Sequence, residues 1–429
     1  MNRSKTSKRL AMMAVLAMTL AACGNGDGGG DPGAANGDDG ADPGGEVTTY
    51  NIAWLSDFSG PYADVWPAVN AGQEAVLDWW NDEVGSELGV RVEGRTYDHR
   101  YDPSQVASLW PGILSDLDPI AALGVGGPDV AALQERLPDD QVPMLMSTAG
   151  YGYAWTADPW VFNPRATYGH EAAAFLQWYA EENGIDDLRF GNISSEASPA
   201  YVDIVEGTES WAEVTDGFTY VGTEYADVQP ADLTTEVRRL LSQDVDVILT
   251  QTNTTAAVLT VQALAQQGAD DVVTMVSAHN GLVASGDAAG DLCVFDGMYE
   301  AYGMAIPAEE SGEAFEFYSL MASDYGLQAE WDVPTVQGLM QQIYAMRVIE
   351  DAVAAVGAEN LDGAAVREAA LNAEITQDES FSLLSELQFT PDAPFPTEGL
   401  TVNVGTVSDC TYSLAAADAS VPVLEQWGQ

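Results

Sequence analysis

The chain has 429 residues, of which 14 are basic and 67 acidic, and its net charge at pH 7 is −53. This charge excludes nucleic acid as a partner, because a protein that binds phosphates needs a basic surface. It also disfavours docking onto an anionic membrane face. An acidic surface of this kind suits a salty or alkaline exterior, where ions screen self-repulsion, although it is also typical of a merely very soluble protein.

The N-terminal segment predicts export. Residues 1–9 carry four basic side chains, and residues 10–20 are apolar but fewer than the roughly 20 residues that span a membrane. Small residues then precede Cys23, so residues 1–22 are predicted to be a signal peptide. The Leu-Ala-Ala-Cys sequence that ends at Cys23 resembles the lipobox of bacterial lipoproteins, which implies a lipid anchor on this cysteine. The alternative is a plain secreted protein with an incidental cysteine.

The segment after Cys23 has no core-forming residues. It is almost wholly Gly, Asp, Ala, Pro and Asn, so residues 23–46 are predicted to be a disordered tether. The rest of the chain is long enough for two domains. Its two cysteines, Cys293 and Cys410, are expected to form a disulfide outside the cell. Without histidines at metal-binding spacing they make no zinc site, so neither a metal nor a cofactor is expected.

After the tether, buried strands alternate with helices. The first series has helices at 68–84 and 102–117, the second of them interrupted at Pro111, and strands at residues 48–56, 90–97, 120–126 and 141–147. The second series has strands at residues 188–195, 218–225, 245–251 and 272–278, and helices at 201–213, 232–242 and 254–267. Asp232 is expected to cap the second of these helices, and Gly268 to end the third.

Two successive series of this kind predict an α/β fold with two doubly wound parallel sheets. Further helices are expected at residues 311–325, 334–356 and 362–373, with short strands within 387–415. The long helices need a sheet to cover, and the first sheet is the available one, so the chain is predicted to cross between two lobes more than once. Several crossings make a hinge, and a cleft is expected at the carboxyl ends of the strands.

Several segments, in this order, resemble the type I solute-binding proteins, specifically the branched-chain amino acid group that serves ABC importers. They are residues 58–63 (FSGPYA), 97–103 (YDHRYDP), 143–149 (PMLMSTA) and 387–392 (LQFTPD). The resemblance covers Tyr50 to about Tyr412 and implies two lobes joined by a three-crossover hinge. The lobes are expected to span residues 47–166 plus 301–378, and residues 167–300 plus 379–429.

Candidate ligand contacts follow the strands of the first lobe. Tyr62 and Trp66 can wall a pocket, although aromatic residues at helical spacing are more often core. Gly126 and Gly127 precede a helix and can offer backbone N–H groups to a ligand oxygen, or form only a tight turn.

Other candidates come from the resemblance. In the family, the loop after the fourth strand binds the ligand carboxylate, which assigns Ala149 and Tyr151 as contacts. Tyr201 lies near the family's aromatic contact in the second lobe, and Asn253 follows a strand there.

Asn280 departs from the family pattern. In amino-acid binders of this family, an acidic residue near this position pairs with the ammonium group of the ligand. The amide of Asn280 cannot supply that negative charge. Either Glu196 supplies it from another loop, or the ligand lacks an ammonium group.

The resemblance implies a non-catalytic receptor that binds a small-molecule solute and presents it to an ABC permease. We expect a monomer outside the cytoplasm, anchored to the cell membrane by lipid. A ligand-sensing lipoprotein with the same fold is the alternative. An exported hydrolase is disfavoured, because His99, His170 and His279 are scattered and the sequence has neither G-x-S-x-G nor H-E-x-x-H.

Overall fold

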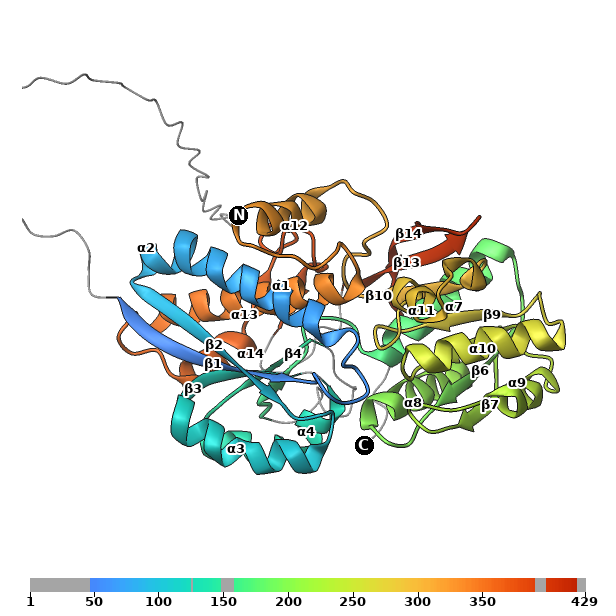
Figure 1. The fold of residues 1–429 in the computed structure, drawn as a ribbon, viewed down its shortest axis with the longest axis horizontal. Helices are drawn as coiled ribbons and strands as arrows, with labels where there is room; N and C mark the ends of the chain where they lie inside the picture. The colour runs from blue at the N-terminus through green and yellow to red at the C-terminus, as the bar shows by residue number, and fades with distance from the viewer. Residues whose placement is uncertain (1–46, 125, 148–157, 390–398, 423–429) are drawn as a thin grey trace, which may run out of the picture. The chain divides into compact units, whose positions relative to one another are not determined.

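The first sheet organises the N-terminal part of the chain. The computed structural model describes residues 47–124, 126–147, 158–389 and 399–422. Five strands lie in the order β2-β1-β3-β4-β5, and every neighbouring pair is parallel (Figure 1). Their bounds are β1 (Thr48–Ser56), β2 (Val90–Asp98), β3 (Pro119–Gly124), β4 (Met144–Met146) and β5 (Val161–Phe162). Residues 52–55 of β1 are all buried, as expected for a parallel strand covered on both faces.

The second sheet repeats this topology. Its order is β14-β13-β10-β9-β8-β6-β7, so β7-β6-β8-β9-β10 have the same sequence of neighbours as the five strands of the first sheet. Two antiparallel strands, β13 and β14, extend its edge beyond β10. The bounds are β6 (Leu188–Ser194), β7 (Phe218–Tyr225), β8 (Val247–Thr250), β9 (Val273–Val276), β10 (Tyr299–Tyr302), β13 (Thr401–Ser408) and β14 (Thr411–Ser420).

Helices cover both faces of the first sheet. Alternate residues of β1 and β3 pack against two separate cores, one under α1, α12, α13 and α14, the other under α3 and α4. These helices are α1 (Trp66–Trp80), α3 (Pro103–Leu117), α4 (Gly127–Leu133), α12 (Glu313–Asp324), α13 (Val333–Val356) and α14 (Gly363–Leu371). Shorter elements are a π-helical turn (Asn81–Gly85), α2 (Ser86–Leu88) and α5 (Leu137–Asp140). The sheet with these elements is called the first lobe below.

Close contact between α1 and α13 depends on two glycines. A Cβ atom at Gly338 would lie 2.0 Å from the carbonyl oxygen of Val69, and one at Gly72 would lie 2.9 Å from that of Thr335. Both distances are shorter than any real Cβ contact, so the two helices can approach this closely only because neither position has a side chain.

The second sheet is covered in the same way, by α7 and α8 on one face and α9 and α10 on the other. The helices are α7 (Tyr168–Asn183), α8 (Pro199–Val214), α9 (Thr234–Leu241), α10 (Thr254–Gln267) and α11 (Leu282–Ala289), followed by a 3-10 turn at Leu292–Phe295. This sheet and these helices form the second lobe. Cys293 in the 3-10 turn and Cys410 after β13 are joined by a disulfide.

The chain passes between the lobes three times, after β5, after β10 and before β13. The second and third passages lie side by side, because Met304 pairs with Leu384 in an antiparallel bridge and Asn403 donates its amide N–H to the Met304 carbonyl at 2.9 Å. Leu384, Leu387 and Phe389 pack in the core of the first lobe, with the small sheet of β11 (Glu374–Ile375) and β12 (Leu387–Gln388).

Most elements expected from sequence are present, including α12 to α14 on the first sheet. One expectation is wrong: α3 runs unbroken through Pro111. Pro111 lies on the exposed side of this helix, while Val106, Trp110 and Ile113 bury the other side against the core, so tertiary packing offsets the missing hydrogen bond. A second expectation is wrong too, because the N-cap of α9 is Leu233 and not Asp232, although Asp232 accepts a hydrogen bond from the Thr234 N–H at 3.3 Å. Gly268 ends α10 in the left-handed conformation, as expected.

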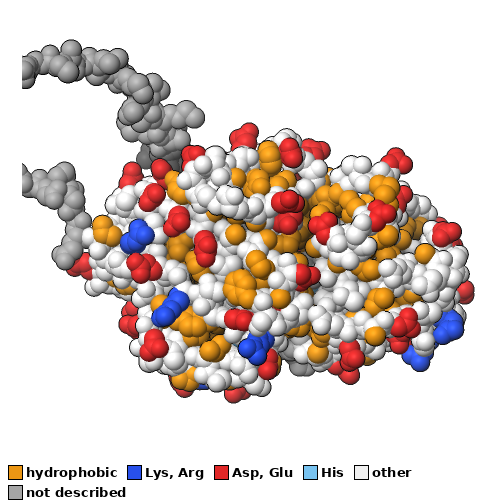
Figure 2. Space-filling view, viewed as in Figure 1, with side chains coloured by type: hydrophobic (Ala, Val, Ile, Leu, Met, Phe, Trp, Pro, Cys, Tyr) orange, Lys and Arg blue, Asp and Glu red, His pale blue; other side chains and the backbone are white. Residues whose placement is uncertain are grey.

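None of the helices in the described ranges is long and apolar enough to cross a membrane. Acidic side chains are spread over the face of the molecule in Figure 2, where basic side chains are few.

Candidate functional site

A pocket lies where the two lobes meet. The first lobe contributes side chains from the start of α1, from the loop after β2 and from the start of α13: Tyr62, Val65, Trp66, Val69, Tyr101, Val333, Pro334 and Gln337. The second lobe contributes Tyr168 and the segment after β9: Ala278, His279, Asn280, Gly281 and Ala284. The space not filled by atoms is about 480 Å³, counting solvent at its mouth, and about 30 Å³ of it can take the centre of a water molecule. That is room for about two waters, so a solute the size of an amino acid needs the lobes to lie further apart.

A buried carboxylate holds the loop that carries Tyr62. Asp57, at the end of β1, accepts hydrogen bonds from the backbone N–H groups of Gly60 at 2.6 Å and Tyr62 at 3.0 Å. Burial raises the pKa of Asp57, and these two hydrogen bonds oppose that rise. The loop then enters α1, which has Pro67 in its first turn, so Trp66 and Val69 follow one turn further along the same wall.

A buried contact between a histidine and a carboxyl group holds the next part of the wall. His99 Nε2 lies 3.2 Å from Asp129 Oδ1, both side chains are fully buried, and Asp129 also accepts a hydrogen bond from the Gly126 N–H. Arg100 and Tyr101, directly after His99, both have positive φ, a conformation that costs energy for side chains of this size. The turn brings the Tyr101 ring to 4.8 Å from that of Tyr62, in an edge-to-face arrangement.

Aromatic rings from both lobes meet at the pocket. The hydroxyl of Tyr62 is hydrogen-bonded to that of Tyr201, in the second lobe. The His279 ring lies 5.7 Å from Tyr62, 5.1 Å from Tyr201 and 4.5 Å from Tyr168. Burial raises the pKa of Tyr62 and Tyr201 well above the usual value, so both remain neutral phenols.

His279 is neutral, and its neighbours fix its tautomer. Burial, with a contribution from the Arg165 charge, lowers the pKa of His279 to about 3. Gln251 Nε2 lies 3.1 Å from Nδ1 of His279 and 3.4 Å from the Ala200 carbonyl, which can only accept, so this amide donates to Nδ1. The ring proton is therefore on Nε2, which is 3.1 Å from the Tyr168 hydroxyl.

Asn280 lines the pocket, but its amide is used for structure. Its Oδ1 accepts from the Ser277 N–H at 2.7 Å, and its Nδ2 donates to the Thr250 carbonyl at 3.2 Å. These bonds join the ends of β8 and β9 and set the direction of the segment that carries His279.

Of the residues predicted from sequence, Tyr62, Trp66 and Asn280 line the pocket, and Tyr201 lies directly behind Tyr62. Asn253 caps α10 by accepting a hydrogen bond from the Ala256 N–H and does not line the pocket.

Gly126 and Gly127 are also absent from the pocket lining. A Cβ atom at Gly126 would lie 3.0 Å from the Tyr101 hydroxyl, so this glycine makes room for a ring that does line it. Ala149 and Tyr151 lie outside the described residues, and their contact with a ligand stays a prediction.

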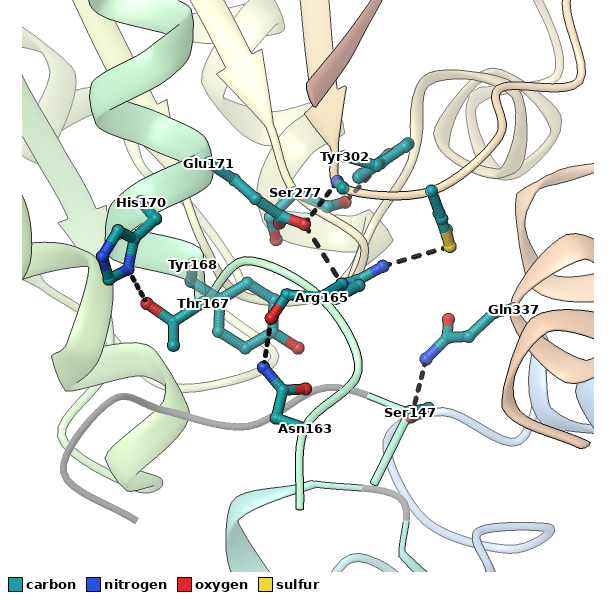
Figure 3. Close-up of polar contacts among 12 residues, drawn as sticks. Ser147, Asn163, Arg165, Thr167, Tyr168, His170, Glu171, Ser277, Tyr302 and Gln337 are labelled. Carbon is teal, nitrogen blue, oxygen red and sulfur yellow. Dashed lines mark hydrogen bonds and ion pairs between the residues drawn. The ribbon is translucent and has the colours of Figure 1, made fainter. Parts of the chain in front are cut away.

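A second polar cluster occupies the passages between the lobes (Figure 3). The guanidinium of Arg165, just after the first passage begins, lies 3.4 Å from Glu171 in α7, and both side chains are buried. The same Glu171 oxygen accepts a hydrogen bond from the Gly303 N–H, in the second passage, at 2.8 Å. Burial outweighs the Arg165 charge and raises the pKa of Glu171 to about 7. Sequence analysis missed this cluster, because its members come from passages with no repeating pattern.

Gln337 was also missed. It lines the pocket from α13, and its Nε2 donates to the Ser147 hydroxyl, at the end of the fourth strand, at 3.0 Å (Figure 3). The described residues contain no group of three or more His, Cys, Asp or Glu side chains that could hold a metal ion.

Two lobes of equal topology, three passages between them and a pocket at the junction define the architecture of the type I solute-binding proteins. The chain belongs to the periplasmic binding protein family, whose model matches residues 49–401. Members of this family are binding proteins rather than enzymes. No curated protein sequence matches the chain.

Solved structures show the same fold. A branched-chain amino acid ABC transporter protein from Thermus thermophilus, crystallised with valine, has a TM-score of 0.72 at 15% identity, over 86% of this chain and 96% of that one. A fatty acid ABC transporter substrate-binding protein from Thermomonospora curvata has a TM-score of 0.72 at 18% identity, over 90% and 97%. A solute-binding protein of an ABC transporter from R. palustris, in complex with 4-hydroxybenzoate, has a TM-score of 0.69 at 18% identity, over 87% and 98%.

Proposed function

We propose that the chain is the extracytoplasmic solute receptor of an ABC importer. The observation that carries this proposal is the pocket itself, whose walls come from both lobes and touch through Tyr62 and Tyr201. A solute that contacts both walls stabilises the closed arrangement, in which the lobes meet. The size of this stabilisation is the difference between its binding free energies to the closed and the open arrangement. A permease can then distinguish the loaded receptor by its shape.

The sequence supports the finer parts of the proposal. The basic start, the short apolar run and Cys23 support export and lipid attachment, and the acidic composition supports work outside the cell as a monomer. Mass spectrometry of the mature protein from a bacterial host tests the anchor: we expect diacylglyceryl on Cys23 and none on the Cys23→Ala variant. An unmodified Cys23 in wild type would contradict it.

Blocking the pocket tests the receptor proposal. Ala284 lines the pocket from α11 and is partly exposed, so the ring of Ala284→Phe occupies the space that a solute would need. Ala288→Phe is the matched control, because Ala288 is exposed on the same helix and does not line the pocket.

The assay is a thermal-shift screen of amino acids, amides, polyamines and aromatic acids, followed by calorimetry on each hit. We expect Ala284→Phe to abolish binding and Ala288→Phe to retain it, with both variants folded without solute as judged by circular dichroism. Equal binding by the two variants would place the solute elsewhere and refute the proposed site.

A further inference from the structure

The described walls of the pocket carry no charged side chain. None of the described residues that line it is Asp, Glu, Lys or Arg, and its one histidine is neutral because burial lowers the pKa of His279 to about 3. The two lobes thus surround the cavity with aromatic rings, short aliphatic side chains and amides. A charged group that leaves water for such a site loses its hydration and gains no counter-ion, which is strongly unfavourable.

The buried ionisable groups around the pocket have contacts outside it. Asp57 accepts hydrogen bonds from two backbone N–H groups, Glu300 accepts from the Leu282 N–H and the Tyr302 hydroxyl, and Asp129 contacts His99. The Arg165 guanidinium lies 3.4 Å from Glu171. None of these side chains lines the pocket. Among the described residues that line the pocket, then, none is a carboxylate that could receive an ammonium group or a cation that could receive a carboxylate.

One polar group of the wall lacks a partner. Trp66 is 4% exposed, and no hydrogen-bond acceptor among the described residues reaches its Nε1–H. Indole nitrogen only donates, and a buried donor without an acceptor costs free energy. A solute oxygen at this position would remove that cost. The lining residues beside Trp66 in the sequence, Val65 and Val69, are apolar.

We propose that the solute is an uncharged molecule with an apolar or aromatic body and a hydrogen-bond acceptor such as an amide carbonyl, and that Trp66 Nε1–H donates to this acceptor. This inference rests on the proposed receptor function. It sets the chain apart from receptors of zwitterionic amino acids.

Matched compounds test the charge of the solute. Two sets of compounds each contain an amide, a carboxylate, an amine and an amino acid with a similar apolar body. The aliphatic set is isocaproamide, isocaproate, isoamylamine and leucine. The aromatic set is phenylacetamide, phenylacetate, phenethylamine and phenylalanine. Calorimetry at pH 7 is expected to give at least about tenfold tighter binding for the amides than for any charged member of the same set. Tighter binding of a charged member would overturn this inference and leave the receptor function standing. Absence of binding by every member, extended to a fragment library of all charge classes, would contradict both.

A matched pair of variants tests the donor. Trp66→Phe keeps an aromatic ring and removes the N–H, and is expected to weaken amide binding about tenfold while raising the affinity for the corresponding hydrocarbon relative to the amide. Trp79→Phe is the control, because Trp79 lies in the same helix but packs against Phe317 and Phe381, away from the pocket. Equal amide affinity in wild type and Trp66→Phe would overturn the assignment of this donor.

Discussion

The contact between α1 and α13 gives a prediction with a sign and a magnitude. In the substitution Gly338→Ala, the new Cβ atom would start 2.0 Å from the Val69 carbonyl oxygen, and both partners are backbone. An ordinary contact needs a separation more than about 1 Å larger, so the two helices must move apart along their buried faces. Overpacking of this kind costs about 1–3 kcal/mol, and the rigidity of two backbones favours the upper end.

The gain in helix propensity offsets part of this cost. Alanine is favoured over glycine within a helix by about 0.8–1 kcal/mol, so we expect Gly338→Ala to lower the free energy of unfolding by about 2 kcal/mol. For a folded unit of about 380 residues the melting temperature should fall by roughly 2–3 °C. Because α1 and α13 also carry Trp66 and Gln337, solute affinity should fall as well.

Gly112→Ala is the matched control. Gly112 also lies inside a helix, α3, but is exposed, and a Cβ atom there meets nothing within 4 Å. Only the propensity term remains, so this variant should be more stable than wild type by about 0.5–1 kcal/mol. Urea denaturation followed by circular dichroism measures both variants. A Gly338→Ala protein as stable as the Gly112→Ala protein would refute the reasoning.

Three further predictions concern stability. Reduction of the Cys293–Cys410 disulfide, which joins residues 117 apart, should lower the free energy of unfolding by about 4–5 kcal/mol in urea, and an unchanged midpoint would count against it. Raising NaCl from about 0.1 M to about 1 M shortens the Debye length from about 10 Å to about 3 Å and should raise the melting temperature of this acidic chain, whereas an uncharged osmolyte at equal osmolality should raise it less. Because burial raises the pKa of Glu171 to about 7, its protonated form is favoured on folding; this contribution is complete below the unfolded pKa and is lost as pH rises through 7. Glu171→Gln should therefore lose less stability than wild type between pH 5 and pH 8, and parallel pH profiles would argue against that assignment.

Much of the fold follows from sequence, because strands covered on both faces are continuous apolar runs with turn residues at their ends. Helix α7 is an exception, because a helix buried on all sides has no apolar stripe that a sequence pattern could reveal. In α7, every residue from Tyr168 to Leu176 is buried, so the helix has no polar stripe to produce a helical period, and sequence analysis passed over it. Pro111 produced the opposite error. A proline within a helix predicts a break, but the packing of α3 on the core keeps the helix continuous.

The pocket could be predicted only in part. Tyr62, Trp66 and Asn280 follow strand ends, and the carboxyl ends of parallel strands meet at one edge of a sheet, which is why they were found. Gln337 could not be found in this way, because it reaches the pocket only through the second passage between the lobes and the packing of α13 on α1. The role of Tyr101 was hidden too, since its direction depends on the positive φ of two successive residues.

The absence of charge in the described pocket walls has more weight in this protein than it would in an average one. Acidic residues outnumber basic ones almost five to one, yet none of the described lining residues is among them. Their distribution over the surface (Figure 2) produces a negative potential that repels an approaching anion and attracts a cation. A receptor for cations would gain by continuing this potential into its cavity, and a receptor for anions would need a local excess of Arg or Lys to overcome it. The described walls do neither, which is what the proposed neutral solute requires.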